Sequence, residues 1–178
     1  MTQIQKPLGF IHIPKTGGKS LIEFFHQNNI PYIYNLHKTI SEIWNVGNQD
    51  YYNITIVRHP YDRVLSFYNF FTKLENSPFS NLSFDEFISN IESISPLIKP
   101  CYDFCTIDSK IQIDYIIKLE NLYDDVGGLC NLLSIQFPDK FPMVNTNENY
   151  SVRKLSSNHK NKIVKVFEKD FKTFSYEP

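Results

Sequence analysis

Short runs of apolar and β-branched residues recur along the chain, and each one predicts a buried strand. The runs cover residues 8–13, 32–36, 53–58 and 113–119. Apolar runs of this length without a polar alternation are typical of strands that are covered on both faces of a sheet. The pattern therefore predicts that these segments are the strands of one buried sheet.

Between these runs, apolar residues recur every three or four positions, which is the spacing of an amphipathic helix. Pro60 suits a helix start, and Ser83 forms a capping-box pattern with Glu86. The pattern predicts helices over residues 19–26, 39–44, 60–74, 83–91, 122–133 and 156 or 157 to 171, and loops over 75–82 and 135–155. It is ambiguous over residues 93–110.

Strands that alternate with helices are typical of the α/β class, in which helices flank a mostly parallel sheet. The chain has 178 residues without an internal repeat or a linker, so we expect a single domain over residues 1–178. In such sheets, ligands bind beyond the carboxyl ends of the strands. The segments that follow the first and third predicted strands are therefore the places to look for chemistry.

The overall charge disfavours general nucleic-acid binding and is compatible with the binding of a small anion. The formal net charge is −1, whereas a general nucleic-acid binder carries a basic excess. A small anionic ligand needs only a few local cations. The three cysteines, Cys101, Cys105 and Cys130, lack zinc-type spacing, so we expect reduced, buried thiols and no metal site. Neither a signal peptide nor a membrane-length apolar run is present, which predicts a cytoplasmic protein without a membrane span.

The segment from Pro14 to Ser20 has the composition of an anion-binding loop. Its sequence is Pro-Lys-Thr-Gly-Gly-Lys-Ser. The glycines allow a sharp turn and a close backbone approach, and the helix that follows directs N–H groups at the loop. The lysines add charge and the hydroxyls add donors. An ordinary strand-to-helix turn accounts for a glycine pair but not for this combination, so the loop predicts a site for a phosphate-like group.

A Walker A loop, G-x-x-x-x-G-K-[ST], is the close alternative. Gly18, Lys19 and Ser20 match its end, but its first glycine would fall at Ile13. A Walker A protein also holds magnesium with an Asp at the end of a neighbouring strand. The third predicted strand ends in Arg58 instead. A cation there favours a second anionic group over a metal ion.

Arg58 opens a second segment with anion-binding chemistry. Its guanidinium can form paired hydrogen bonds with a phosphate. Ser66 follows about two turns into the next helix, so it lies near Arg58 only if that helix runs back beside the loop. For Arg63, a functional role and a surface pair with Asp62 are equally consistent with the sequence.

Together, these segments resemble the PAPS-dependent sulfotransferases, particularly the carbohydrate-type branch. Residues 10–21 resemble the family's 5′-phosphosulfate loop, usually written P-K-T-G-G-T-S, and residues 56–70 resemble its 3′-phosphate pattern, V-R-[DNH]-P-x-x-R-x-x-S-x-Y. Residues 113–122 and 166–176 are similar to its weaker patterns, D-x-I-x-R-x-E-x-L and Y-x-x-D-F-x-x-F-x-Y. The resemblance spans nearly the whole chain and implies a P-loop-NTPase-like three-layer sandwich.

By position, the resemblance implies a nucleotide-donor site that needs no metal. Lys15 would contact the oxygen that bridges sulfur and the 5′-phosphate, and Arg58 and Ser66 would hold the 3′-phosphate. Further donor contacts are implied for Pro14, Thr16, Gly17, Gly18, Lys19 and Ser20. Related enzymes cover the donor with a basic loop, which would place Arg153 and Lys154 there unless they are simply solvated. Lys19 departs from the family's usual Thr, and the extra cation either tightens donor binding or admits ATP-like ligands.

A hydroxyl acceptor also needs a general base, and histidine suits this task because its pKa lies near neutrality. His37 follows the second strand at the ligand-binding edge and resembles the base position of uronyl 2-O-sulfotransferases. A surface role for His37 stays open, and Asp103 and Glu120 are possible structural or base carboxylates. The other histidines are expected in the core (His12), in shaping a loop (His59) and in solvated helices (His26 and His159).

These residues give the working hypothesis of a sulfotransferase that moves a sulfuryl group from PAPS to a hydroxyl, with PAP as product. The acceptor is expected to be a carbohydrate. Lys15 would stabilise the leaving phosphate, and His37 would accept the proton. A P-loop kinase or NTPase and a non-catalytic nucleotide-binding module are the alternatives. Magnesium dependence distinguishes the kinase, and indifference to substitution of Lys15 or His37 distinguishes the non-catalytic module.

Overall fold

The computed structural model describes residues 4, 6–44, 50–75, 77–94, 96, 98–144 and 154–178. Their contacts divide the chain into two compact units. The first unit is drawn from Met1–Val57 and Asp103–Glu148, and the second from Arg58–Tyr102 and Asn149–Pro178. Each unit has a hydrophobic core of its own. The expectation of one domain over residues 1–178 stays a prediction.

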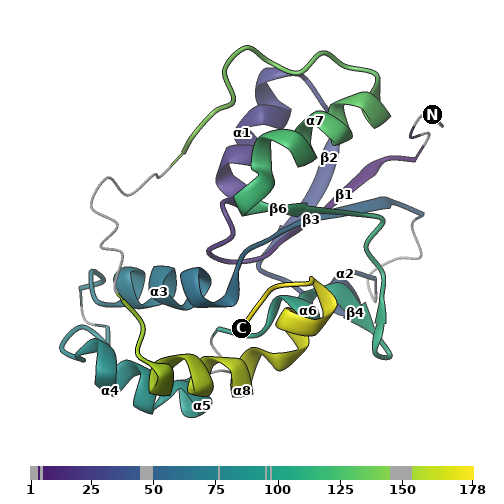
Figure 1. The fold of residues 1–178 in the computed structure, drawn as a ribbon. Helices are drawn as coiled ribbons and strands as arrows, with labels where there is room; N and C mark the ends of the chain where they lie inside the picture. The colour runs from purple at the N-terminus through teal and green to yellow at the C-terminus, as the bar shows by residue number, and fades with distance from the viewer. Residues whose placement is uncertain are drawn as a thin grey trace. The chain divides into compact units, whose positions relative to one another are not determined.

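A parallel sheet forms the centre of the first unit (Figure 1). Its strands are β1 (Leu8–His12), β2 (Tyr32–Leu36), β3 (Tyr52–Val57) and β6 (Tyr115–Lys118). Within the described residues they pair in the order β2-β1-β3-β6, and every pairing is parallel. The carboxyl ends of all these strands therefore lie at one edge, with β2 and β3 on opposite sides of β1. The strands that the hydrophobic pattern predicted are confirmed.

Helices α1 (Gly18–Gln27) and α7 (Leu122–Leu133) lie side by side over the sheet in Figure 1. Their apolar residues share one core with the strands, and full burial of each such side chain contributes about 1.5–3 kcal/mol. The buried members of this core are Leu8, Phe10, Leu21, Phe24, Phe25, Ile54, Ile56, Ile117, Leu122, Val126, Leu129, Cys130 and Phe141. A parallel sheet flanked by helices is the α/β fold that the sequence predicted.

The stretch after residue 93, which the sequence pattern left ambiguous, contains a short helix and a hairpin. Helix α6 (Cys101–Cys105) leads into β4 (Thr106–Ile107) and β5 (Lys110–Ile111), which pair antiparallel. Asp108 and Ser109 connect these strands with positive φ, the backbone conformation that a two-residue hairpin turn requires. Strands of two residues are too short to show a periodic pattern, so the sequence could not reveal them.

The remaining elements of the first unit are α2 (Ile40–Trp44) and the short 3₁₀ helix η2 (Leu119–Asn121). The fourth strand was expected over residues 113–119, but it covers only Tyr115–Lys118. Its predicted end belongs to η2, because the chain turns there into α7. Glu120 is exposed in this turn.

The second unit is helical. Its main elements are α3 (Pro60–Phe71), α4 (Phe84–Ser89), α5 (Ile91–Ile94) and α8 (Ser157–Thr173). Helix α8 packs against the other three, and the core between them is rich in aromatic residues. Helix α3 ends before residue 74, where the pattern predicted its end.

Helix starts in the second unit follow their sequence signals. Pro60 is the first residue of α3, and His59 is its N-cap. Ser83 and Glu86 form the predicted capping box at α4. Of the two serines expected to open α8, Ser156 is the N-cap.

The three cysteines are free and buried, as expected. Burial raises the pKa of Cys101 to about 12, which keeps it in the thiol form. Within the described part of the chain, no helix is long and apolar enough to span a bilayer.

Candidate functional site

The loop between β1 and α1 has an unusual backbone. Ile13 is fully buried, and Lys15 and Gly17 follow with positive φ, at 67° and 85°. A lysine rarely adopts this left-handed conformation, because its Cβ crowds the backbone. The surrounding structure therefore holds Lys15 in a strained conformation, which is typical of functional loops.

Both glycines of the loop have a steric reason to be glycine. Gly17 is the N-cap of α1 in the left-handed region, and a Cβ added there would lie 2.7 Å from Leu119 Cδ1. A Cβ at Gly18 would lie 2.3 Å from Cδ2 and 2.5 Å from Nε2 of His12. We expect both glycines to bring the backbone to an anion, and the structure adds that Gly18 gives room to the ring of His12.

The amino end of α1 has the electrostatic character of an anion site. No side chain caps this helix, and its first turn contains no acidic residue. The first N–H groups of a helix carry partial positive charge, so they favour an anion placed against them. Lys19, in the first turn of α1, is exposed and adds a full positive charge.

The two hydroxyl groups of the loop make different contacts. Thr16 is fully buried, and its Oγ1 donates to the carbonyl oxygen of Ile13 at 2.9 Å. Because the hydroxyl proton of Thr16 is engaged within the loop, a hydrogen bond from Thr16 to the donor would have to come from its backbone N–H. The assignment of Thr16 to the donor site stays a prediction. Ser20 Oγ accepts from the N–H of Val144 at 3.0 Å. That bond leaves the hydroxyl proton of Ser20 available for donation to a phosphate.

His12 and His37 lie against each other at the carboxyl edge of the sheet. His12 ends β1 and pairs in register with Leu36 of β2, so His37 comes directly after the neighbouring strand. Their ring centroids are 5.2 Å apart. His12 is buried and also stacks on Phe10, with ring centroids 5.5 Å apart. His37 is exposed and has a φ of 58°.

Both histidines are biased toward the neutral form. Burial lowers the pKa of His12 to about 4, and the charges of His37 and Lys19 add to this shift. The pKa of His37 is also lowered, first by the partial burial of its ring and then by the charges of Lys15 and Lys19. Although His37 is exposed, one side of its ring lies against His12, which explains why desolvation acts on it. A neutral imidazole can accept a proton at neutral pH.

The second predicted segment, from Arg58 onward, belongs to the second unit. Arg58 directly follows β3 and is half-buried. His59 Nδ1 accepts from the N–H of Tyr61 at 3.3 Å, and its Nε2 lies 3.1 Å from the carbonyl oxygen of Glu177. These partners place the ring proton on Nε2. His59 thus shapes the turn into α3, as expected. Ser66 is half-buried in the second turn of α3.

Arg63 lies in the interior, so the alternative that places it on the surface is wrong. Only 1% of Arg63 is exposed, and its Nη1 donates to the carbonyl oxygen of Lys99 at 2.8 Å. Its guanidinium also lies over the ring of Phe67. These contacts tie α3 to the segment that precedes α6.

The remaining predicted residues lie in different places. Lys154 is exposed before the start of α8, and Arg153 lies outside the described residues. His159 was expected in a solvated helix position, but its side chain is mostly buried and its Nε2 lies 2.6 Å from Asp85 Oδ1. His26 is exposed beside Tyr32.

Among the residues that the structure describes, no group of three or more His, Cys, Asp or Glu side chains is placed to hold a metal ion.

Two contacts of the loop were not predicted from the sequence. The role of His12 against Gly18 was missed, although the alternation along β1 could have placed its ring on the α1 face. The hydrogen bond from Val144 to Ser20 joins residues 124 positions apart. No local pattern signals such a contact.

Comparison with known proteins identifies the family. The family model described as "Sulfotransferase family" matches residues 5–177. A search of the curated proteins gave no match. Among solved structures, mouse sulfotransferase SULT7A1 complexed with PAP is similar at a TM-score of 0.45 and 12% identity, over 97% of this chain and 68% of that chain. That likeness is weak, so the assignment rests on the family model. The chain belongs to the sulfotransferase family, as the resemblance of its two loops to the PAPS-dependent enzymes predicted.

Proposed function

We propose that the chain transfers a sulfuryl group from PAPS to a hydroxyl of a carbohydrate, with Lys15 and His37 as its catalytic residues. One backbone observation supports this choice of residues. Among the described residues, the other non-glycine positions with positive φ are Asn, Asp or Ser in turns or after helices: Asn29, Asp108, Ser109, Ser134 and Ser175. Lys15 and His37 are the exceptions, and both stand at the carboxyl edge of the sheet. Strained backbone of this kind clusters at active sites.

The residues of the loop fit an anionic donor. The uncapped amino end of α1, Lys15 and Lys19 supply positive charge, and the left-handed turn at Gly17 exposes backbone. PAPS supplies the sulfuryl group and a phosphate leaving group. Charge develops on the oxygen between sulfur and phosphate as that bond breaks, and an ammonium fixed beside it lowers the barrier. We assign this task to Lys15.

His37 fits the second task, which is to take the proton of the acceptor hydroxyl. Its lowered pKa keeps the imidazole neutral at physiological pH. His12, which lies against it, is neutral as well, because its pKa is about 4. The imidazolium that forms after proton transfer therefore has no charged histidine beside it.

We assign the 3′-phosphate of the donor to Arg58 and Ser66 of the second unit. Two observations support this assignment. Both residues belong to the segment that resembles the family's 3′-phosphate pattern, and His59 caps α3 and so fixes the turn that follows Arg58. Lys154 is a further donor contact in this proposal, and Arg153 is proposed from the sequence alone. The carbohydrate acceptor follows from the resemblance to the carbohydrate-type branch.

Substitution of the two catalytic residues tests the proposal. Lys15→Ala should lower kcat about 100-fold or more, because one electrostatic contact to the transition state is lost. His37→Ala and His37→Gln should abolish transfer to an oligosaccharide acceptor while the affinity for PAP stays unchanged. The measurements are transfer of labelled sulfate from PAPS and calorimetric titration with PAP.

His26→Ala is the matched control. His26 is an exposed residue near the end of α1, and its ring lies beside the side chain of Tyr32, so its loss should leave transfer intact. Full turnover in His37→Gln would move the base to another residue. Wild-type protein that binds PAP but sulfates no hydroxyl acceptor would favour the non-catalytic module.

A further inference from the structure

One buried ring, that of His12, touches two parts of the candidate site. His12 is the last residue of β1 and is 5% exposed. Its ring lies against the start of α1, because a Cβ added at Gly18 would be 2.3 Å from its Cδ2 and 2.5 Å from its Nε2. The ring also contacts that of His37, with the two centroids 5.2 Å apart. His12 therefore contacts both the loop of residues 14–20, which is proposed to bind the donor, and the proposed base.

The ring of His12 is itself held in place by the core. Strand β1 pairs with β2 on one side and with β3 on the other, so its backbone is fixed within the sheet. Phe10 lies on the same face of β1, and the ring of His12 stacks on it, with centroids 5.5 Å apart and planes 18° apart. Phe10 is 1% exposed and meets Phe25 of α1 edge to face. A ring packed in this way keeps one rotamer, because close-packed neighbours exclude the others.

The backbone of His37 is fixed on both sides, but its side chain is exposed. Before it, β2 pairs with β1 as far as Leu36. After it, the N–H of Thr39 donates to the carboxylate of Glu42 at 2.7 Å, and the N–H of Glu42 donates to Oγ1 of Thr39 at 3.3 Å, as in a capping box. Exposed side chains exchange rotamers rapidly. The contact with the fixed ring of His12 is therefore expected to select one rotamer of His37.

We propose that His12 is a positioning residue for the transfer: its ring holds the imidazole of His37 in one orientation and at a fixed distance from the start of α1. This inference rests on the proposed function, because it gives His12 a task in the proton transfer assigned to His37. It also gives the buried histidine of β1, which the sequence pattern placed in the core, a role in the site.

The reaction supplies the reason for such a platform. The base must reach the acceptor hydroxyl while the donor lies against the loop, so the spacing between His37 and the start of α1 sets the geometry of attack. A misplacement of about 1 Å can lower a rate about 100-fold. The pKa of His12, about 4, keeps its ring uncharged at neutral pH. The ring can therefore lie against His37 without repelling the imidazolium that forms.

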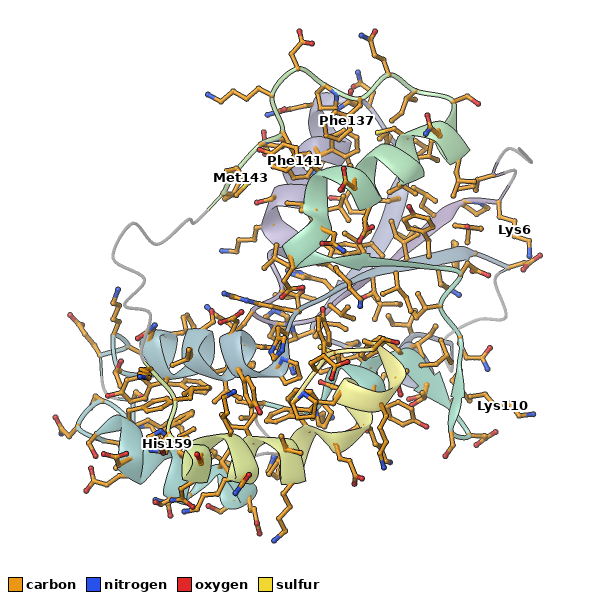
Figure 2. The ribbon with its side chains drawn as sticks, viewed as in Figure 1. Lys6, Lys110, Phe137, Phe141, Met143 and His159 are labelled. Carbon is orange, nitrogen blue, oxygen red and sulfur yellow. The ribbon has the colours of Figure 1, made fainter. Side chains whose placement is uncertain are left out.

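The experiment compares His12→Leu with two controls. Leucine is similar in size and apolar, but it lacks the flat ring that faces His37. Leu129→Ala truncates a fully buried residue of α7 in the core of the same unit, so it controls for lost stability. Lys6→Met removes an exposed lysine that precedes β1, at the opposite edge of the sheet from His12 (Figure 2), so it controls for remote effects on the spectra.

Two of the readouts do not require activity. In the full-length wild type without ligand, nuclear Overhauser effects between the ring protons of His12 and His37 report their contact. In every variant, three-bond couplings across χ1 of His37 report whether its side chain keeps one rotamer. Transfer of labelled sulfate at saturating PAPS to an oligosaccharide then gives kcat and KM, calorimetry gives the Kd of PAP, and urea gives the free energy of unfolding.

We expect the Overhauser effect in the wild type and a single rotamer of His37 in the wild type and in both controls. In His12→Leu, the couplings should become averaged and kcat should fall roughly 10- to 100-fold, with a smaller change in the KM of the acceptor. Leu129→Ala should lose stability while its kcat stays within a few-fold of the wild type.

Three results would overturn the inference and leave the proposed function standing: no Overhauser effect in the wild type, a single rotamer of His37 in His12→Leu, or a loss of kcat no greater than that in Leu129→Ala at equal loss of stability. Weaker binding of PAP with kcat unchanged and the rotamer of His37 kept would show that His12 serves the loop alone, which also contradicts the inference. Averaged couplings with unchanged kcat would show that His37 is not the base, so the proposed catalytic assignment would fail together with the inference.

Discussion

The ring of His12 stacks on Phe10 and lies under the first residue of α1, where it leaves room only for a glycine. A core residue thereby sets the position of the loop backbone that is expected to bind the donor. Its low pKa keeps the ring neutral, so it fills this space without adding charge. At the residue scale, packing and the proposed chemistry are coupled through this contact.

Gly18→Ala should therefore displace His12. The added methyl group would sit 2.3 Å from Cδ2 of His12 and 3.2 Å from Cζ of Phe10, and overpacking of this kind costs about 1–3 kcal/mol. We expect a corresponding loss in the free energy of unfolding, measured with urea, and weaker binding of PAP.

Gly127→Ala is the control for this substitution. Gly127 lies inside α7, and a Cβ there meets nothing within 4 Å. Alanine in a helix interior is favoured over glycine by about 0.5–1 kcal/mol, so this variant should be more stable than the wild type. Equal stability of the two variants would show that the contact with His12 does not constrain the loop.

Helix α6 has only five residues, and α8 supplies the group that anchors its start. Asp170 is 1% exposed, and its two carboxylate oxygens accept from the N–H groups of Cys101 and Tyr102, each at 2.8 Å. A carboxylate at the start of a helix satisfies N–H groups that have no partner within the helix. The thiol of Cys101 also accepts a backbone hydrogen bond from Arg58. This contact links α8, through α6, to the segment proposed to bind the 3′-phosphate.

Asp170→Ala should destabilise the protein by about 1–3 kcal/mol for each buried N–H that loses its partner. Asp170→Asn retains one acceptor oxygen, so its effect on the free energy of unfolding should be smaller. Glu168→Gln in the same helix is the control, because its pair with Lys172 is exposed and exposed pairs contribute little. A loss in Asp170→Ala no greater than that in Glu168→Gln would contradict the anchoring role.

The family model matches residues 5–177, so both compact units belong to the same match. At the scale of the whole molecule, the donor is therefore expected to stabilise the folded chain against unfolding. A ligand at 100 times its Kd adds about 2.7 kcal/mol. For a chain of this length, each kcal/mol corresponds to roughly 2–4 °C in Tm.

PAP at that concentration should raise Tm by about 5–10 °C, measured by differential scanning calorimetry. ATP with magnesium should have a smaller effect, and Arg58→Ala should weaken PAP far more than adenosine 5′-phosphosulfate, which lacks the 3′-phosphate. Stronger stabilisation by ATP with magnesium would favour the P-loop kinase alternative. Equal weakening of both ligands in Arg58→Ala would remove the 3′-phosphate from this residue.

The sequence by itself determined the strands of the sheet, most helix starts and the two loops with anion-binding chemistry. These features depend on neighbours close in the chain: apolar runs, caps such as Ser83, and a glycine pair between lysines. Only the tertiary structure decided that Arg63 is buried, that His159 pairs with Asp85 and that His12 lies against both Gly18 and His37. Such contacts join residues far apart in sequence, so they depend on how strands and helices pack, which no local pattern encodes.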